Sequence, residues 1–187
     1  MKKFCITFLL SGIIILSAVA LSVGGVGGVS RQSAPTRCEY FRIHIRADSN
    51  EKEAQAVKLK VRDAVVEYLT PLVAVADSKE QAMSLTKGKL KEIEEVAASV
   101  LERNGYFYGA TASLKSESFP TRVYGDYTLS AGEYEALIIE LGLGRGDNWW
   151  CVVYPPLCFS SAGGENVKYK SLIREKIERW KSRMKDR

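Results

Sequence analysis

The chain has 187 residues, of which 46% are hydrophobic and 26% charged, and its formal net charge is +5 at pH 7. A single histidine and no further cluster of ligand residues exclude a zinc site of the usual kind. The basic charge is local, because residues 168–187 hold nine Lys or Arg against three Asp or Glu, and Lys2 and Lys3 add two more. The rest of the chain therefore carries a net negative charge, and the basicity is not a property of the folded body.

The N-terminus has the pattern of an export signal. Lys2 and Lys3 precede an almost wholly apolar stretch, and Ala18-Val19-Ala20 fits a cleavage site of the A-x-A kind. The apolar stretch is also long enough, at about 20 residues, to stay as a membrane anchor. We therefore predict a signal peptide or membrane anchor over residues 1–23 and a flexible linker, rich in Gly and Ser, over 24–38. An exported chain rarely meets nucleic acid, so we expect no nucleic-acid partner.

A single domain is predicted over residues 39–160, and it begins with a strand and a helix. Residues 40–47 alternate, with Phe41, Ile43 and Ile45 on one face and Arg42, His44 and Arg46 on the other, which predicts a half-buried strand. Asp48 and Asn50 are placed to cap a helix over 51–69, with Pro71 just past its end. Ser78 should cap a second helix that runs to about Arg103, bends near Gly88 and stops at Asn104-Gly105.

After residue 105 the apolar period changes from helical to alternating. Strands are expected over residues 106–115, 119–124, 132–141 and 149–154. The short turns between them favour antiparallel pairing. The predicted fold is α+β, with an antiparallel sheet of about four to five strands packed against two long helices.

The last segment, residues 161–187, is predicted to be a basic amphipathic helix or tail. Leu172, Ile173, Ile177 and Trp180 recur at helical spacing among the basic residues. Such a helix can lie on an anionic membrane surface. Alternatively, it can dock on the domain through the same apolar residues and leave its charges in solvent.

The stretch from Asp147 to Phe159 is the most unusual part of the composition, with two tryptophans, two cysteines and two prolines. Trp149, Trp150 and Tyr154 are candidates for partner binding, because Trp and Tyr dominate binding hot spots; burial of both tryptophans in the core is the alternative. An exported setting favours a disulfide between Cys151 and Cys158. Two buried, unpaired cysteines, or pairing of either with Cys38, remain open alternatives.

Charged residues near the turns give two further candidates. Arg122 and Asp126 could brace a turn through paired hydrogen bonds or contribute to a partner-binding surface. His44 could serve a cysteine nucleophile only if the fold brought it beside Cys151 or Cys158. Its position on the polar face of a strand favours a structural or solvated histidine. We therefore predict no catalytic residues, no cofactor and no metal.

Five blocks of the sequence, in order and with sensible spacing, resemble the stage II sporulation protein R family. They are FRIHIRADS (41–49), AVKLKVRDAV (56–65), FPTRVYGD (119–126), LSAGEYEAL (129–137) and NWWCVVYPPLCF (148–159). The resemblance implies a signalling protein that the forespore exports to the space between the two cells of a sporangium. There it would bind and activate a membrane-embedded aspartic protease of the mother cell, which processes pro-sigma-E.

Three functions therefore stand as hypotheses. The leading one is a non-enzymatic, exported activator of that protease. The rival is an exported, cysteine-dependent hydrolase acting on cell wall or peptide through Cys151 or Cys158 with His44. A weaker third is a structural protein held at a lipid surface by its basic tail.

Overall fold

The protein is represented by a computed structural model that describes residues 39–124, 127–159 and 167–185. The predicted signal peptide or anchor and the linker up to residue 38, with Cys38, lie outside the described residues. Asp126 lies outside them too, so its predicted partnership with Arg122 stays a prediction.

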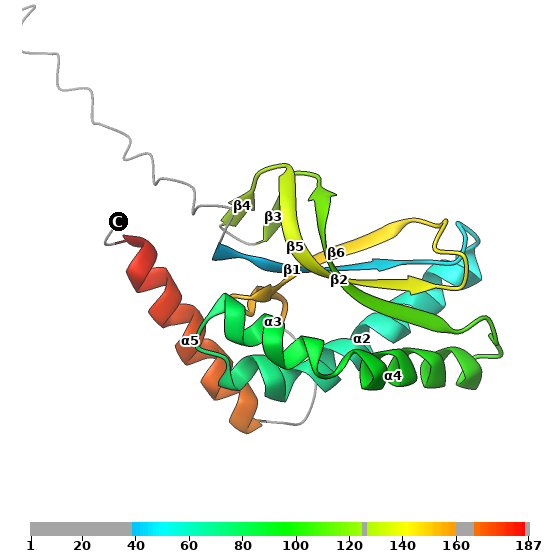
Figure 1. Ribbon diagram of the computed structural model, residues 1–187, viewed down its shortest axis with the longest axis horizontal. Helices are drawn as coiled ribbons and strands as arrows, with labels where there is room; N and C mark the ends of the chain where they lie inside the picture. Colours follow the sequence, from blue (N-terminus) through cyan, green and yellow to red (C-terminus); the bar gives the residue numbers. More distant parts are fainter. Residues whose placement is uncertain (1–38, 125–126, 160–166, 186–187) are drawn as a thin grey trace, which may run out of the picture. The chain divides into compact units, whose positions relative to one another are not determined.

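A four-stranded sheet with the order β2-β5-β1-β6 forms the centre of the domain (Figure 1). Its strands are β1 (Phe41–Arg46), β2 (Ala110–Phe119), β5 (Gly132–Leu141) and β6 (Asn148–Tyr154). The α+β class is confirmed, but the sheet is mixed: β1 runs parallel to β5 and antiparallel to β6, and β2 runs antiparallel to β5. The parallel pair is possible because three helices separate β1 from the later strands, a connection long enough for a crossover.

Three helices cover one face of this sheet: α2 (Lys52–Val75), α3 (Lys79–Lys87) and α4 (Leu90–Arg103) (Figure 1). Their apolar stripes and the inward residues of the strands form the larger core. Its fully buried members include Phe41, Ile43, Ile45, Val61, Val65, Leu69, Ile93, Leu101, Leu137 and Ile139.

The opposite face of the sheet is also covered. A small hairpin of β3 (Arg122–Tyr124) and β4 (Tyr127–Leu129) packs there, together with Trp180 from α5 (Val167–Lys185). A second core forms from Tyr40, Phe119, Leu129, Tyr134, Ala136, Ile138, Val152 and Trp180. The prediction of a half-buried first strand is therefore wrong, because a central strand covered on both faces buries Arg42 and His44 as well.

The first helix extends beyond its predicted end. It was expected to stop at Leu69, before Pro71, but α2 continues through Pro71 to Val75. Val73 and Ala74, in the last turn, are buried in the larger core. Burial of this extra turn outweighs the hydrogen bond that a proline cannot donate.

The second predicted helix is two helices, α3 and α4, which are separated at Gly88. Gly88 ends α3 with φ −69° and donates its N–H to the carbonyl oxygen of Ser84 at 3.2 Å. The predicted cap is confirmed at Ser78, whose Oγ accepts a hydrogen bond from the N–H of Gln81 at 3.1 Å.

Asp48 and Asn50 do not cap α2, contrary to expectation. The N-cap of α2 is Glu51, which has no side-chain cap hydrogen bond. Asp48 and Asn50 instead accept the N–H groups of Leu143 (2.7 Å) and Asp147 (2.6 Å), in the turn between β5 and β6. These carboxylate and amide oxygens therefore tie the β1–α2 junction to that turn.

Two strand boundaries also differ from the expectation. β2 begins at Ala110 rather than at residue 106, after Gly109 with φ +73°. The strand expected over 119–124 is divided, because β2 ends at Phe119, Pro120 cannot donate to a ladder, and β3 starts at Arg122. After β6, a 3-10 turn spans Leu157–Phe159.

The basic C-terminal helix is present as α5. Among the side chains of α5 that the structure describes, Ile173, Ile177 and Trp180 are buried against the domain. The side chain of Leu172 lies outside the described ones. In the described part of the chain, no helix is long and apolar enough to cross a membrane.

Candidate partner-binding site

The two adjacent tryptophans of β6 point to opposite faces of the sheet, as their strand positions require. Trp149 packs against the helix-side core, and the guanidinium carbon of Arg62 lies 5.7 Å from its ring centroid. Trp150 packs against the second core, where its ring centroid lies 4.6 Å from that of Phe119. Both side chains are half-buried, so each combines a core role with a partly accessible edge.

A partly buried polar cluster lies beneath Trp150. The Nδ1 atom of His44 is 2.7 Å from the Oε2 atom of Glu117, and Arg46 binds both Glu117 and Glu140. Burial lowers the pKa of His44 to about 4, although a hydrogen bond with Asn148 and the charge of Glu140 favour the protonated form. The imidazole is therefore neutral at pH 7 and serves as a structural group.

Arg42 is a fully buried cation on the same face of the sheet. Its Nη2 donates to the hydroxyl oxygen of Tyr124 at 2.6 Å, and its guanidinium carbon lies 4.1 Å from the ring centroid of Phe119. Burial lowers its pKa from the ordinary value. The hydroxyl and the aromatic faces thus take the place of a carboxylate partner.

Cys151 and Cys158 are joined by a disulfide in the structure, with their Cα atoms 6.3 Å apart. Cys151 pairs with Ile43 across the strands and belongs to the helix-side core, whereas His44 pairs with Trp150 and faces the other side of the sheet. The arrangement needed by the rival hypothesis, a free cysteine with His44 as its base, is therefore not formed by these three residues.

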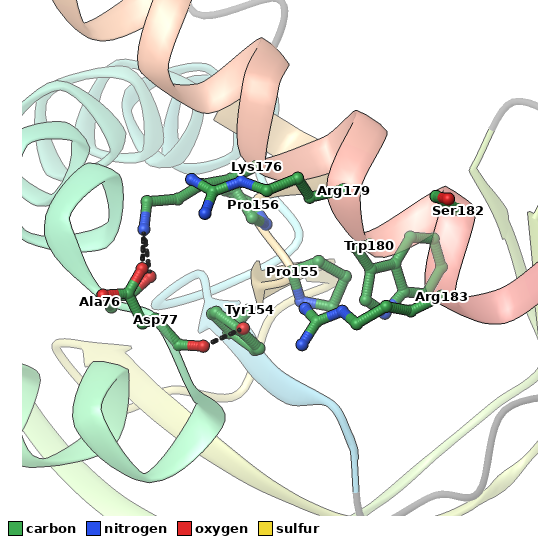
Figure 2. Close-up of a pocket in the computed structure, with 10 residues that line it drawn as sticks. All are labelled: Ala76, Asp77, Tyr154, Pro155, Pro156, Lys176, Arg179, Trp180, Ser182 and Arg183. Atoms are coloured by element: carbon green, nitrogen blue, oxygen red, sulfur yellow. Dashed lines mark hydrogen bonds and ion pairs between the residues drawn. The ribbon is translucent and has the colours of Figure 1, made fainter.

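A pocket of about 460 Å³ lies between the end of β6 and α5 (Figure 2). Tyr154, Pro155 and Pro156 form one side, and Trp180 closes the pocket from the helix. The Tyr154–Pro155 peptide bond is cis, and the Tyr154 hydroxyl donates to the carbonyl oxygen of Asp77 at 2.8 Å. The strand end and the α2–α3 junction are thereby fixed against each other.

Three basic side chains of α5 line the same pocket: Lys176, Arg179 and Arg183. They extend from α5 toward Asp77 and Tyr154 (Figure 2). Lys176 binds the carboxylate of Asp77 at 2.6 Å and the carbonyl oxygen of Ala76 at 2.8 Å. The hydrogen bond and charge of Lys176 lower the pKa of the Asp77 carboxyl, which therefore stays ionised.

The predicted partner-binding residues are not brought together as one group. Tyr154 lines the pocket, the two tryptophans lie on opposite faces, and Arg122 is exposed on β3. The sequence did not single out Asp77, Lys176, Arg179 or Arg183 as site residues. The helical spacing of Lys176, Arg179 and Arg183 could be seen in the sequence of the tail. The segment that the tail docks against could not be identified from the sequence.

No group of three or more His, Cys, Asp or Glu side chains within 39–124, 127–159 and 167–185 is arranged to hold a metal ion. The pocket at α5 combines a concave surface with basic side chains.

Comparison with known proteins gives one family. The sequence model described as "Stage II sporulation protein R" matches residues 37–163. The chain is 41% identical over 129 residues to "Stage II sporulation protein R" of Bacillus subtilis (strain 168), which covers 68% of this chain and 58% of the relative. The chain thus spans less than two thirds of the length of that relative. No solved structure matches the chain.

Proposed function

Because the chain belongs to the stage II sporulation protein R family and is a sporulation signalling protein, we propose that it activates a membrane-embedded aspartic protease. That protease would process pro-sigma-E in the mother cell. The chain would be exported across the forespore membrane and act in the space between the two membranes, either secreted or held by its N-terminal segment.

One observation carries this proposal: the family match spans the folded domain except for α5. Residues 37–163 contain every described strand and the helices α2 to α4. They also contain all members of the two cores except Ile173, Ile177 and Trp180 of α5. The match therefore reflects a shared domain rather than a short motif.

The geometry favours docking over catalysis. The two cysteines on which the hydrolase depends are bonded to each other, and His44 is buried on the other side of the sheet. An activator needs only a surface whose affinity differs between the inactive and active states of the protease. This protein has three accessible surfaces for such docking: the exposed edges of the two tryptophans, Arg122, and the pocket at α5.

The test is reconstitution in a non-sporulating bacterium that expresses the protease and pro-sigma-E. Co-expression of the full chain should produce processed sigma-E, detected as a faster band on an immunoblot. A protease whose catalytic aspartate is replaced controls for processing by host enzymes. A chain lacking residues 1–23 should fail, because it cannot reach the outer side of the membrane.

Absence of processing with a folded, exported chain would count against the proposal. The hydrolase is separated by a double substitution, Cys151→Ala with Cys158→Ala. A hydrolase would lose all activity with its nucleophile, whereas an activator would lose activity only in proportion to its unfolded fraction. Circular dichroism of the purified variant measures that fraction.

A further inference from the structure

We infer that the pocket between the end of β6 and α5 binds an acidic peptide segment of a partner protein, with a carboxylate held by Arg179 and Arg183. The ligand is inferred from the geometry, and the inference rests on the proposed function only for the partner's identity. It adds a contact that the family match does not contain, since the match ends at residue 163 and α5 begins at Val167.

The first argument is the balance of charge in the pocket. Lys176 is already used, because its ammonium group binds Asp77 and the Ala76 carbonyl and its side chain is only 11% exposed. Arg179 reaches Glu175 at 3.4 Å, in a pair whose side chains are both 61% exposed, so the ion pair is weak.

Arg183 is exposed and, among the described residues, forms no ion pair within 4.0 Å. Two guanidinium groups thus face a pocket whose one carboxylate, that of Asp77, is bound by Lys176. A carboxylate from outside would supply the missing acceptor, and guanidinium groups bind carboxylates with two parallel hydrogen bonds.

The second argument is the shape and composition of the walls. Pro155, Pro156 and Trp180 give rigid apolar surfaces next to the charges (Figure 2). A volume of about 460 Å³ can hold a few side chains but no folded element. An extended segment with an acidic residue beside an apolar one fits both features.

The third argument separates a peptide from a lipid surface. A basic helix that lies on a membrane buries its apolar face in the headgroup region. In α5 that face is already used, because Ile173, Ile177 and Trp180 are buried against the domain. The side chains of Lys176, Arg179 and Arg183 also line a concave pocket (Figure 2). Cations that bind a membrane would instead project outward from a convex surface of the protein.

The test uses two fluorescein-labelled decapeptides. One alternates Glu with Pro and Leu, and the other has Gln in place of each Glu. Their binding to the purified chain is measured by fluorescence anisotropy. We expect the Glu peptide to bind, and the Gln peptide to bind at least roughly tenfold more weakly because it lacks the charge-assisted hydrogen bonds.

The variant R179Q/R183Q should weaken binding of the Glu peptide by roughly tenfold or more. The matched control is R174Q/K185Q, which removes the same charge from exposed positions of α5 that do not line the pocket. It should bind like the parent chain. Thermal melts of both variants confirm that α5 stays docked.

Three results would overturn the inference: equal binding of the two peptides, equal weakening by the two double variants, or binding to phosphatidylglycerol vesicles with none to the Glu peptide. The peptide measurement contains no protease, so a failure to process pro-sigma-E leaves its result unchanged. Conversely, a chain that activates the protease but ignores the peptide refutes only the pocket.

Discussion

The imidazole of His44 is stacked on the indole of Trp150, with ring centroids 3.7 Å apart and ring planes inclined by 19°. In the tautomer that carries its proton on Nδ1, His44 donates a hydrogen bond to the carboxylate of Glu117 at 2.7 Å. Burial keeps this sole histidine of the chain neutral at pH 7, in a position between an aromatic ring and a carboxylate. Its role is to pack and orient β1, β2 and β6.

This geometry predicts how stability depends on pH. The folded-state pKa of His44, about 4, lies below its ordinary value of 6.5. The unfolded chain therefore takes up a proton first as the pH falls, and stability is lost between about pH 6.5 and pH 4. By pH 5 the free energy of unfolding should fall by about 2 kcal/mol from this group alone. Urea unfolding at a series of pH values measures the loss.

Two measurements isolate the histidine from the carboxylates that also titrate in this range. The variant His44→Gln should show a flatter pH dependence, whatever its absolute stability. Proton NMR of the folded protein reports the imidazole directly, because there is one histidine. A titration midpoint near 6.5 in the folded state would refute the account.

The disulfide should stabilise the end of β6. Closing so short a loop between Cys151 and Cys158 contributes about 2–3 kcal/mol in the chain-entropy account. Urea unfolding with and without reducing agent should differ by that amount. The double variant Cys151→Ala with Cys158→Ala should match the reduced protein and be insensitive to the reducing agent. A difference that persists in this variant would assign the effect to other cysteines.

Gly146 is required by the close approach of two backbones. A Cβ atom there would lie 2.1 Å from the carbonyl oxygen of Ser49, so the β1–α2 junction or the β5–β6 turn must shift. We expect Gly146→Ala to lower the free energy of unfolding by about 2 kcal/mol or more. Gly88→Ala is the control, because its nearest neighbour is 3.7 Å away and its φ is −69°. Equal effects of the two substitutions in thermal melts would contradict this account.

Tyr124 should matter through its hydroxyl rather than its ring. The variant Tyr124→Phe removes the oxygen that accepts from the buried guanidinium of Arg42. Leaving part of a buried cation unsatisfied should cost about 1–3 kcal/mol. Val123→Ala is the neighbouring control, since that side chain is 67% exposed and should change stability by less than about 0.5 kcal/mol. Urea unfolding of both variants measures these changes. If Tyr124→Phe leaves the free energy of unfolding unchanged, Arg42 finds another acceptor.

Arg122 offers a test of the predicted partner-binding residues. It is exposed on β3, so Arg122→Glu should change stability by less than about 0.5 kcal/mol. If this surface contacts the protease, the charge reversal should lower processing of pro-sigma-E in the reconstituted system. Lys91→Glu makes the same charge change at an exposed position of α4. Equal processing by the two variants would remove Arg122 from the contact surface.

The sequence by itself determined the α+β class and the positions of most elements. Apolar residues at alternating spacing predicted the strands β1, β5 and β6 with small errors at their ends. Helical spacing located the helical region, although α3 and α4 were expected as one helix and α2 runs on to Val75. Local signals also succeeded where they act within a few residues, as with the cap at Ser78. These features follow from short-range backbone geometry, which a linear pattern records directly.

Tertiary contacts decided the rest. Only the structure showed that β1 is a central strand, so that Arg42 and His44 are buried although they alternate with apolar residues. Only packing could carry α2 through Pro71, and only the β5–β6 turn could draw Asp48 and Asn50 away from capping. The pocket likewise joins Asp77, Tyr154 and Arg183, which are far apart in the chain. No local pattern predicts such sites, because they form only when docking of α5 brings distant segments together.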